Sequence, residues 1–116
     1  MTELHANCRL WLFADGHNGV FGDGKVRLLR EIERCGSLRQ AALALGVSYR
    51  KAWGDLNKAE SCLGQQLIVR SRGGRDGGQT QLTEVGRRWI EAYEGFSGSV
   101  RSHLDDAFNQ HLRPLL

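Results

Sequence analysis

Residues 36–53 read GSLRQAALALGVSYRKAW, and this stretch decides the predicted fold. Ser37 begins a capping box, because its hydroxyl can accept the amide hydrogen of Gln40 while the glutamine side chain reaches back. The short alanine-rich helix that follows ends at Gly46, which permits the positive φ of a tight turn. Ser48 then caps the next helix. Two helices around such a turn predict a helix-turn-helix, with an ordinary α-hairpin as the alternative.

The apolar residues on both sides of this turn recur at helical spacing. Before the turn, a helix capped by Asp23 is expected to end at Gly36. Val26, Leu29 and Ile32 form the apolar face of that helix. The apolar face of the helix after the turn comprises Tyr49, Ala52, Trp53, Leu56, Ala59 and Leu63. We therefore interpret Trp53 as a core residue and not as an exposed platform.

Short strand-like segments accompany these helices. The segment 9–14, RLWLFA, predicts a strand that ends in a turn over 15–19. The segments 66–71, QLIVRS, and 79–83, QTQLT, predict a β-hairpin. Their connection, 72–78, is rich in glycine and contains two arginines, so we interpret the hairpin as a basic wing, with a disordered loop as the alternative. The fold class is mainly α with a small β component, a winged helix-turn-helix.

A single long helix is predicted after the Thr83 cap, and an apolar stripe follows it. The expected dimer interface on this stripe comprises Trp89, Tyr93, Phe96, Val100, Leu104 and Phe108. A second copy is the economical partner, because the stripe exceeds what a three-helix core can cover. The alternative is a core helix that breaks at 95–98. We assign 1–82 to the strand, helix-turn-helix and wing, and 83–116 to the long helix of the same domain.

The net charge of +3 is concentrated in the middle of the chain. Residues 48–76 contain six basic and three acidic side chains, and residues 23–47 contain five and three. The segments on either side are slightly acidic. A basic middle indicates a surface that faces a polyanion such as DNA, although a solvated helix face has a similar composition.

The expected DNA contacts lie on the recognition helix, about 48–61, in the major groove and on the wing, 70–79, against the backbone or minor groove. Arg50 is the candidate for a bidentate contact with guanine, and Asn57 for an adenine edge or mere solvation. Gly54 allows close approach to the groove. The full set of DNA-binding candidates is Ser37, Arg39, Gln40, Ser48, Tyr49, Arg50, Lys51, Asn57, Lys58, Arg70, Arg72 and Arg75.

Three motifs occur together in order: GVSYRKAW at 46–53, GGRDGG at 73–78 and LTEVG at 82–86. Over residues 9–110 this order resembles the N-terminal domain of ModE-type molybdate-responsive regulators and, more distantly, LysR-type winged helices. The resemblance implies a symmetric dimer on double-stranded DNA and control of molybdenum-related genes. The Mop-type ligand domains of ModE-type regulators do not fit within 116 residues. We therefore expect a stand-alone regulator or part of a longer protein, binding no small molecule itself.

Other classes of function lack their motifs in this sequence. There is no paired-carboxylate cluster, nucleophile elbow, Walker loop or HExxH, so we expect no catalytic residues, cofactor or metal. No apolar run is long enough for a membrane span, and the sparse cysteines indicate reduced thiols in a cytoplasmic protein. The aromatic residues occupy core stripes, which disfavours single-stranded RNA. The remaining alternative is a dimeric protein-interaction adaptor that uses the long helix without specific DNA reading.

Overall fold

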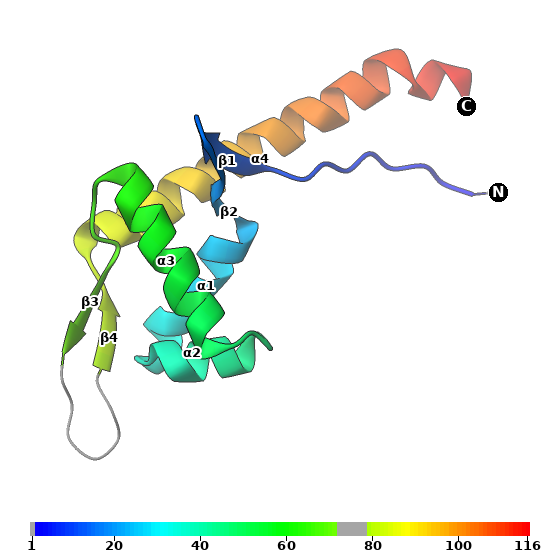
Figure 1. Ribbon diagram of the computed structural model, residues 1–116. Helices are drawn as coiled ribbons and strands as arrows, with labels where there is room; N and C mark the ends of the chain where they lie inside the picture. Colours follow the sequence, from blue (N-terminus) through cyan, green and yellow to red (C-terminus); the bar gives the residue numbers. More distant parts are fainter. Residues whose placement is uncertain (1, 72–78) are drawn as a thin grey trace.

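The computed structural model describes residues 2–71 and 79–116, and it contains three short helices, two small hairpins and one long helix (Figure 1). The principal dimensions are 62 × 33 × 24 Å, because the long helix extends beyond the core. In chain order the elements are β1 (Trp11–Ala14), β2 (His17–Gly22), α1 (Asp23–Cys35), α2 (Leu38–Ala44), α3 (Tyr49–Leu63), β3 (Ile68–Ser71), β4 (Gln79–Leu82), α4 (Glu84–His111) and the 3-10 turn η1 (Arg113–Leu115).

The helix-turn-helix predicted from residues 36–53 is confirmed as α2 and α3. The hydroxyl oxygen of Ser37 accepts a hydrogen bond from the amide of Gln40 at 3.1 Å. Gly46 has a φ of 70°, a left-handed conformation that glycine adopts without steric cost. The small side chain of Ala41 is completely buried, so α2 packs closely on its neighbours. Local signals therefore fix this part of the fold.

The N-terminal hairpin differs from the prediction over residues 15–19. The turn is confined to Asp15–Gly16, and β2 begins at His17 and pairs antiparallel with β1. Gly19 has a positive φ within this strand, at 68°. The cluster of turn-forming residues was misleading because the apolar residues of the strand come later, where Val20 and Phe21 are buried in the core.

The beginning of α1 also differs from the prediction. Asp23 is the first helical residue and does not cap the helix; the N-cap is Gly22, without a side-chain cap bond. The carboxylate of Asp23 instead lies 3.0 Å from the hydroxyl of Tyr93 in α4. The predicted end of α1 is confirmed, since Gly36 is the left-handed C-cap. Asp23 therefore joins α1 to the long helix.

The second hairpin, β3–β4, pairs in the register Ile68 with Leu82. The predicted strand at 66–71 begins two residues later, because the chain before Ile68 bonds to helices. The amide of Leu67 donates to the carboxylate of Glu60 in α3 at 2.7 Å. The hydroxyl of Thr83 donates to the carbonyl oxygen of Gln66, also at 2.7 Å. The connection at 72–78, with the predicted wing residues Arg72 and Arg75, lies outside the described residues.

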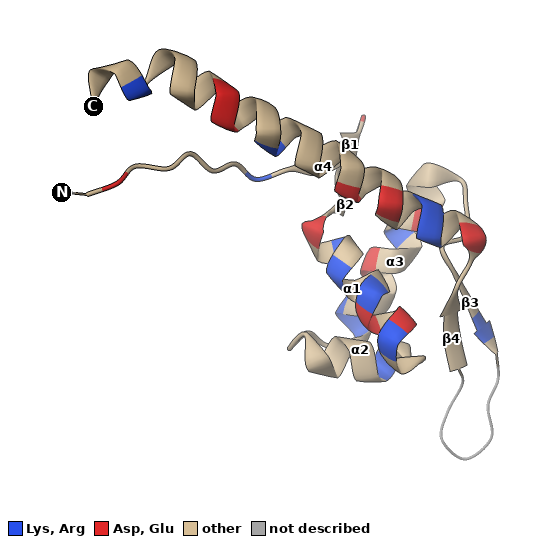
Figure 2. Ribbon diagram, turned by 180° about the vertical axis from the view of Figure 1, so that it is seen from behind, with Lys and Arg blue, Asp and Glu red and all other residues tan. Residues whose placement is uncertain are grey.

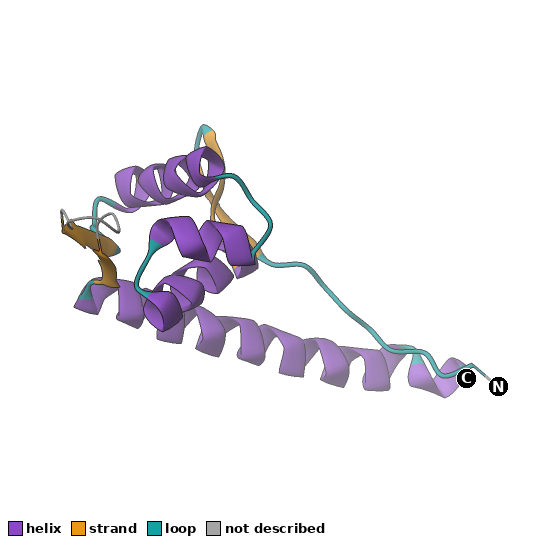
Figure 3. Cartoon of the chain, turned by 90° about the horizontal axis from the view of Figure 1, so that it is seen from below, coloured by secondary structure: helices purple, strands orange, loops and turns teal. Residues whose placement is uncertain are grey.

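The long helix α4 runs unbroken over 28 residues, so the alternative break at 95–98 is wrong. Thr83 is its N-cap, as predicted, and accepts a hydrogen bond from the amide of Gly86. Gly86 lies so close to the chain before β3 that an added Cβ would stand 2.3 Å from the carbonyl oxygen of Leu67. The segment before β1 runs alongside the second half of α4 (Figure 3), and Arg101 of α4 donates to the side-chain oxygen of Asn7 at 2.9 Å.

Candidate nucleic-acid interface

Helix α3 presents two different faces. Ala52, Leu56 and Ala59 are buried against the core. The 3.6-residue period places Arg50 and Gly54 on the opposite side, and both are exposed. Asn57 lies at the edge of the outward face and is half-buried, and Lys58 is exposed beside it. Two alanines and a leucine thus anchor α3 on one side, and the other side is basic and polar.

The predicted contact residues at the helix starts already take part in local structure. The hydroxyl of Ser48 accepts a hydrogen bond from the amide of Lys51 at 3.0 Å, so Ser48 is the N-cap of α3. Ser37 plays the same part for α2. Gln40 and Arg39 are exposed in the first turn of α2. The two helix starts lie near each other, because Arg39 in the first turn of α2 reaches the ring of Tyr49, the first residue of α3.

The two lysines of α3 hold polar partners within the chain. Lys51 forms an ion pair with Asp55 at 2.9 Å, one turn further along the exposed helix. Lys58 donates to the backbone carbonyl of Asn18 in β2. Lys25 of α1 donates to the carbonyl of Gly19 at 3.3 Å, and burial, with the nearby charges of Lys51 and Lys58, lowers the pKa of Lys25 although Asp55 opposes this shift. These contacts join the N-terminal hairpin to α1 and α3.

Two arginines predicted to contact DNA lie over aromatic rings. The guanidinium carbon of Arg39 lies 4.7 Å from the ring centre of Tyr49, and that of Arg70 lies 5.5 Å from the ring centre of Trp53. Trp53 is 42% exposed, so its interpretation as a core residue is wrong. It lies at the edge of the apolar stripe, and Ala52 and Leu56 fill the core without it.

The stripe on α4 divides into covered and accessible residues. Tyr93 is buried by its own chain, and its hydroxyl lies 3.0 Å from the carbonyl of Leu10 and from the carboxylate of Asp23. Phe108 is also buried, with the guanidinium group of Arg113 over its ring. Phe96 remains 45% exposed. Val100 and Leu104 are half-buried.

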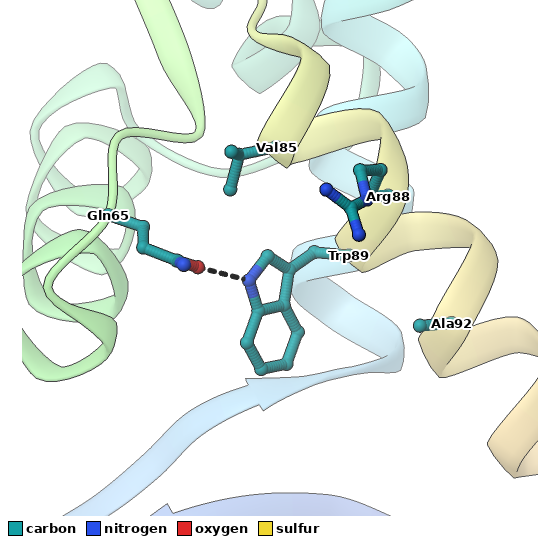
Figure 4. Close-up of a pocket in the computed structure, with 5 residues that line it drawn as sticks. All are labelled: Gln65, Val85, Arg88, Trp89 and Ala92. Atoms are coloured by element: carbon teal, nitrogen blue, oxygen red, sulfur yellow. Dashed lines mark hydrogen bonds between the residues drawn. The ribbon is translucent and has the colours of Figure 1, made fainter.

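Trp89 lies at the edge of a shallow pocket lined by Gln65, Val85, Arg88 and Ala92 (Figure 4). Its ring nitrogen donates to the side-chain oxygen of Gln65 at 2.7 Å, and its ring packs on Phe21 at 5.4 Å between centres. Trp89 is therefore half-buried and joins α4 to the chain that follows α3.

Charge is distributed unequally over the elements. Lysine and arginine outnumber aspartate and glutamate on α1 and α3, whereas acidic residues outnumber them on α4 (Figure 2). Among residues 2–71 and 79–116, no group of three His, Cys, Asp or Glu side chains could hold a metal ion. Within the same ranges, no helix has the length and apolar character needed to cross a membrane.

Three helices with a helix-turn-helix and a β-hairpin directly after the second of its helices define a winged helix-turn-helix. Comparison with known families agrees with this class. The model of the bacterial regulatory helix-turn-helix proteins of the LysR family matches residues 24–87. The chain belongs to this family.

The sequence is also similar to several ModE proteins. It is 41% identical over 105 residues to "Molybdenum transport protein ModE" of Azotobacter vinelandii, covering 90% of this chain and 38% of the relative. It is 41% identical over 89 residues to "Transcriptional regulator ModE" of Haemophilus influenzae, covering 76% and 35%. The chain thus spans less than two fifths of the length of these relatives. The name of the Haemophilus protein describes a regulator and not an enzyme.

Solved structures share the fold. The DNA-binding domain of CbnR, crystallised in complex with DNA, superposes with a TM-score of 0.56 at 20% identity, covering 75% of this chain and 94% of that domain. The DNA-binding domain of BenM, in complex with a benA DNA site, gives a TM-score of 0.53 at 18% identity, covering 78% and 96%. At these identities the likeness concerns the fold alone.

Proposed function

We propose that this chain is a sequence-specific transcriptional regulator that binds double-stranded DNA as a homodimer, with α3 in the major groove. The observation that carries the proposal is the outward face of α3, where Arg50, Gly54 and Asn57 stand opposite the buried alanines. A helix of this kind fits the major groove, and the absence of a Cβ substituent at Gly54 lets the backbone approach the bases.

In this proposal, some residues recognise bases and others position the protein on the DNA backbone. Arg50 contacts a guanine through two hydrogen bonds, and Asn57 contacts an adenine edge. Ser37, Gln40 and Ser48 meet the backbone near the starts of α2 and α3, as do the wing arginines Arg70, Arg72 and Arg75. Lys51 and Lys58 already hold partners within the chain, so their contacts with DNA require that Asp55 and Asn18 be shared or released.

The homodimer in this proposal forms through α4. Tyr93 and Phe108 are covered within one chain, so the second copy is expected to contact the accessible part of the stripe. That part comprises Phe96, Trp89, Val100 and Leu104. Two copies related by a two-fold axis would present two recognition helices to two half-sites.

The genes under control are inferred from the relatives. The similarity to proteins named ModE supports molybdenum-related target genes, with the regulator acting in the cytoplasm. We propose that this chain does not itself bind molybdate. An oxyanion needs several donors in a desolvated pocket. The exposed basic residues of α3 and β3 face solvent and are assigned to DNA, so an anion there would compete with the operator.

Selection of binding sites from random duplex DNA tests this function. We expect enrichment of one sequence and a footprint with two half-sites about one helical turn or more apart. Enrichment of no sequence by a dimeric protein would favour the protein-interaction adaptor instead. Titration calorimetry with molybdate in sulfate-free buffer tests the proposal that the chain binds no molybdate. Saturable binding at micromolar concentration would contradict it.

A further inference from the structure

Two aromatic rings are exposed on one flank of α3, one helical turn apart. Tyr49 is 41% exposed and Trp53 is 42% exposed. Residues four apart lie on the same side of a helix. The core beneath this part of α3 is filled by Ala52 and Leu56, which are buried. Packing alone therefore does not account for two large rings at the border of the outward face.

Each ring is covered by an arginine from a different element. Arg39 comes from the first turn of α2 and lies 4.7 Å from the ring centre of Tyr49. Arg70 comes from β3, at the base of the wing hairpin, and lies 5.5 Å from the ring centre of Trp53. Both distances lie within the range of about 6 Å in which a cation is attracted to an aromatic face. The stacks thus connect α3 to both neighbouring elements.

The described part of the chain places no carboxylate beside these two arginines. Within residues 2–71 and 79–116, no carboxylate oxygen lies within 4.0 Å of the side-chain nitrogens of Arg39 or Arg70. In contrast, Arg30 and Arg34 of α1 pair with glutamates at 2.5–3.1 Å. A guanidinium group that stacks on a ring uses its face for this contact. The hydrogen-bond donors at its edge stay available to a phosphate.

We propose that Tyr49 and Trp53 are positioning residues for DNA binding, which hold Arg39 and Arg70 in the orientation that meets the phosphate backbone. An arginine that is already ordered against a ring loses less conformational freedom when it binds a phosphate. The role rests on the proposed function, because it presumes that α3 enters duplex DNA. It assigns affinity to two aromatic residues that contact neither a base nor a phosphate.

A double-mutant cycle on Trp53 and Arg70 tests this role. Affinity is measured for the duplex selected from random DNA and for a scrambled duplex of equal composition. Trp53→Leu should weaken binding to both duplexes about two- to fivefold. Trp53→Phe should restore most of the loss, because it keeps a ring. In the Arg70→Gln background, Trp53→Leu should cause no further loss.

Two controls accompany the cycle. Trp11→Leu removes another exposed tryptophan, 56% exposed on β1, and should leave DNA affinity unchanged. In the free protein, the side-chain methylene protons of Arg70 should show an upfield ring-current shift in NMR spectra, and Trp53→Leu should abolish it. The corresponding cycle with Tyr49→Leu and Arg39→Gln tests the second stack.

Three outcomes would overturn the positioning role alone. The first is a loss of DNA affinity on Trp53→Leu that is equally large in the Arg70→Gln background, which would mean that the ring itself touches DNA. The second is an unchanged affinity of Trp53→Leu, which would mean that the ring is purely structural. The third is the absence of a ring-current shift for Arg70 in the wild-type protein. Circular dichroism confirms that each variant is folded. If the folded wild-type protein binds no duplex at low salt, the proposed function fails, and the positioning role fails with it.

Discussion

Helices α3 and α4 both begin at a hydroxyl cap, yet they relate to the core differently. Helix α3 spans 15 residues, buries Ala52, Leu56 and Ala59 against the core, and leaves Arg50 and Gly54 exposed on the opposite side. Helix α4 is nearly twice as long, with five acidic and three Lys or Arg residues, and its second half extends beyond the core (Figure 1). One helix is therefore suited to a polyanion and the other to a protein surface. In the proposed function, base recognition and dimerisation therefore fall to separate parts of one domain.

Phe96→Glu should have the largest effect, because a symmetric interface loses two apolar side chains at once. Each buried phenylalanine contributes about 1.5–3 kcal/mol, so the dimer should dissociate at micromolar concentration in analytical ultracentrifugation. Phe13→Glu is the matched control, since Phe13 is 70% exposed on β1 and lies outside the stripe. A wild-type protein that is monomeric at micromolar concentration would remove the dimer from the account.

Gly86→Ala should disrupt the packing of α4 against the chain between α3 and β3. A Cβ at this position would stand 2.3 Å from the carbonyl oxygen of Leu67, so the variant should lose about 1–3 kcal/mol or more of the free energy of unfolding. Gly95→Ala, in open space on the same helix, should gain up to about 1 kcal/mol. Urea denaturation measures both variants. Equal stabilities would mean that α4 does not press on the chain before β3.

Arg50→Ala should affect the recognition region only. We expect a loss of about 1–3 kcal/mol in binding to the selected duplex and a relaxed preference at one base pair of each half-site. Arg88→Ala removes an exposed arginine from α4 and should leave base preference unchanged. Binding assays on single-base variants of the duplex measure the preference. A uniform loss over all base pairs would assign Arg50 to the backbone and not to a base.

Tyr93→Phe should have a smaller effect, of about 1 kcal/mol at neutral pH, because the partly buried hydrogen bond of the hydroxyl is lost. Burial, together with the hydrogen bond to Asp23, raises the pKa of Tyr93 to about 12. The stability from the protonated hydroxyl is therefore present below pH 10, the ordinary pKa, and is lost as the pH rises through about 12. The difference in unfolding free energy between wild type and variant should shrink over this interval. A difference that stays constant to pH 12 would contradict the assignment.

The features predicted correctly from the sequence are those with local causes. The caps Ser37, Ser48 and Thr83 and the glycine ends of α1 and α2 depend on residues within one turn of the helix end. The length of α4 was predicted from its continuous periodic stripe. Its glycines at 95 and 98 suggested a break, but they cost too little to interrupt a helix of this length.

The features that were missed have non-local causes. The turn-forming residues of β2 become a strand because they pair with β1 and continue into the buried Val20. Trp53 was assigned to the core because it borders the apolar stripe, but its neighbour is Arg70, distant in sequence. The recurrence of Tyr49 and Trp53 four residues apart was the one available signal. No sequence pattern indicates which arginines will cover these rings.

The most direct test of the central claim is the salt dependence of binding to duplex DNA. Lysines and arginines that contact phosphates release counterions, so about six contacts predict a slope near −5 in a plot of log affinity against log salt concentration. Fluorescence anisotropy with the selected duplex, between about 50 and 200 mM salt, measures this slope. Removing the one phosphate contact of Arg70 with Arg70→Gln should flatten it by about one unit. An affinity that does not change over this range would contradict the assignment of this chain to DNA binding.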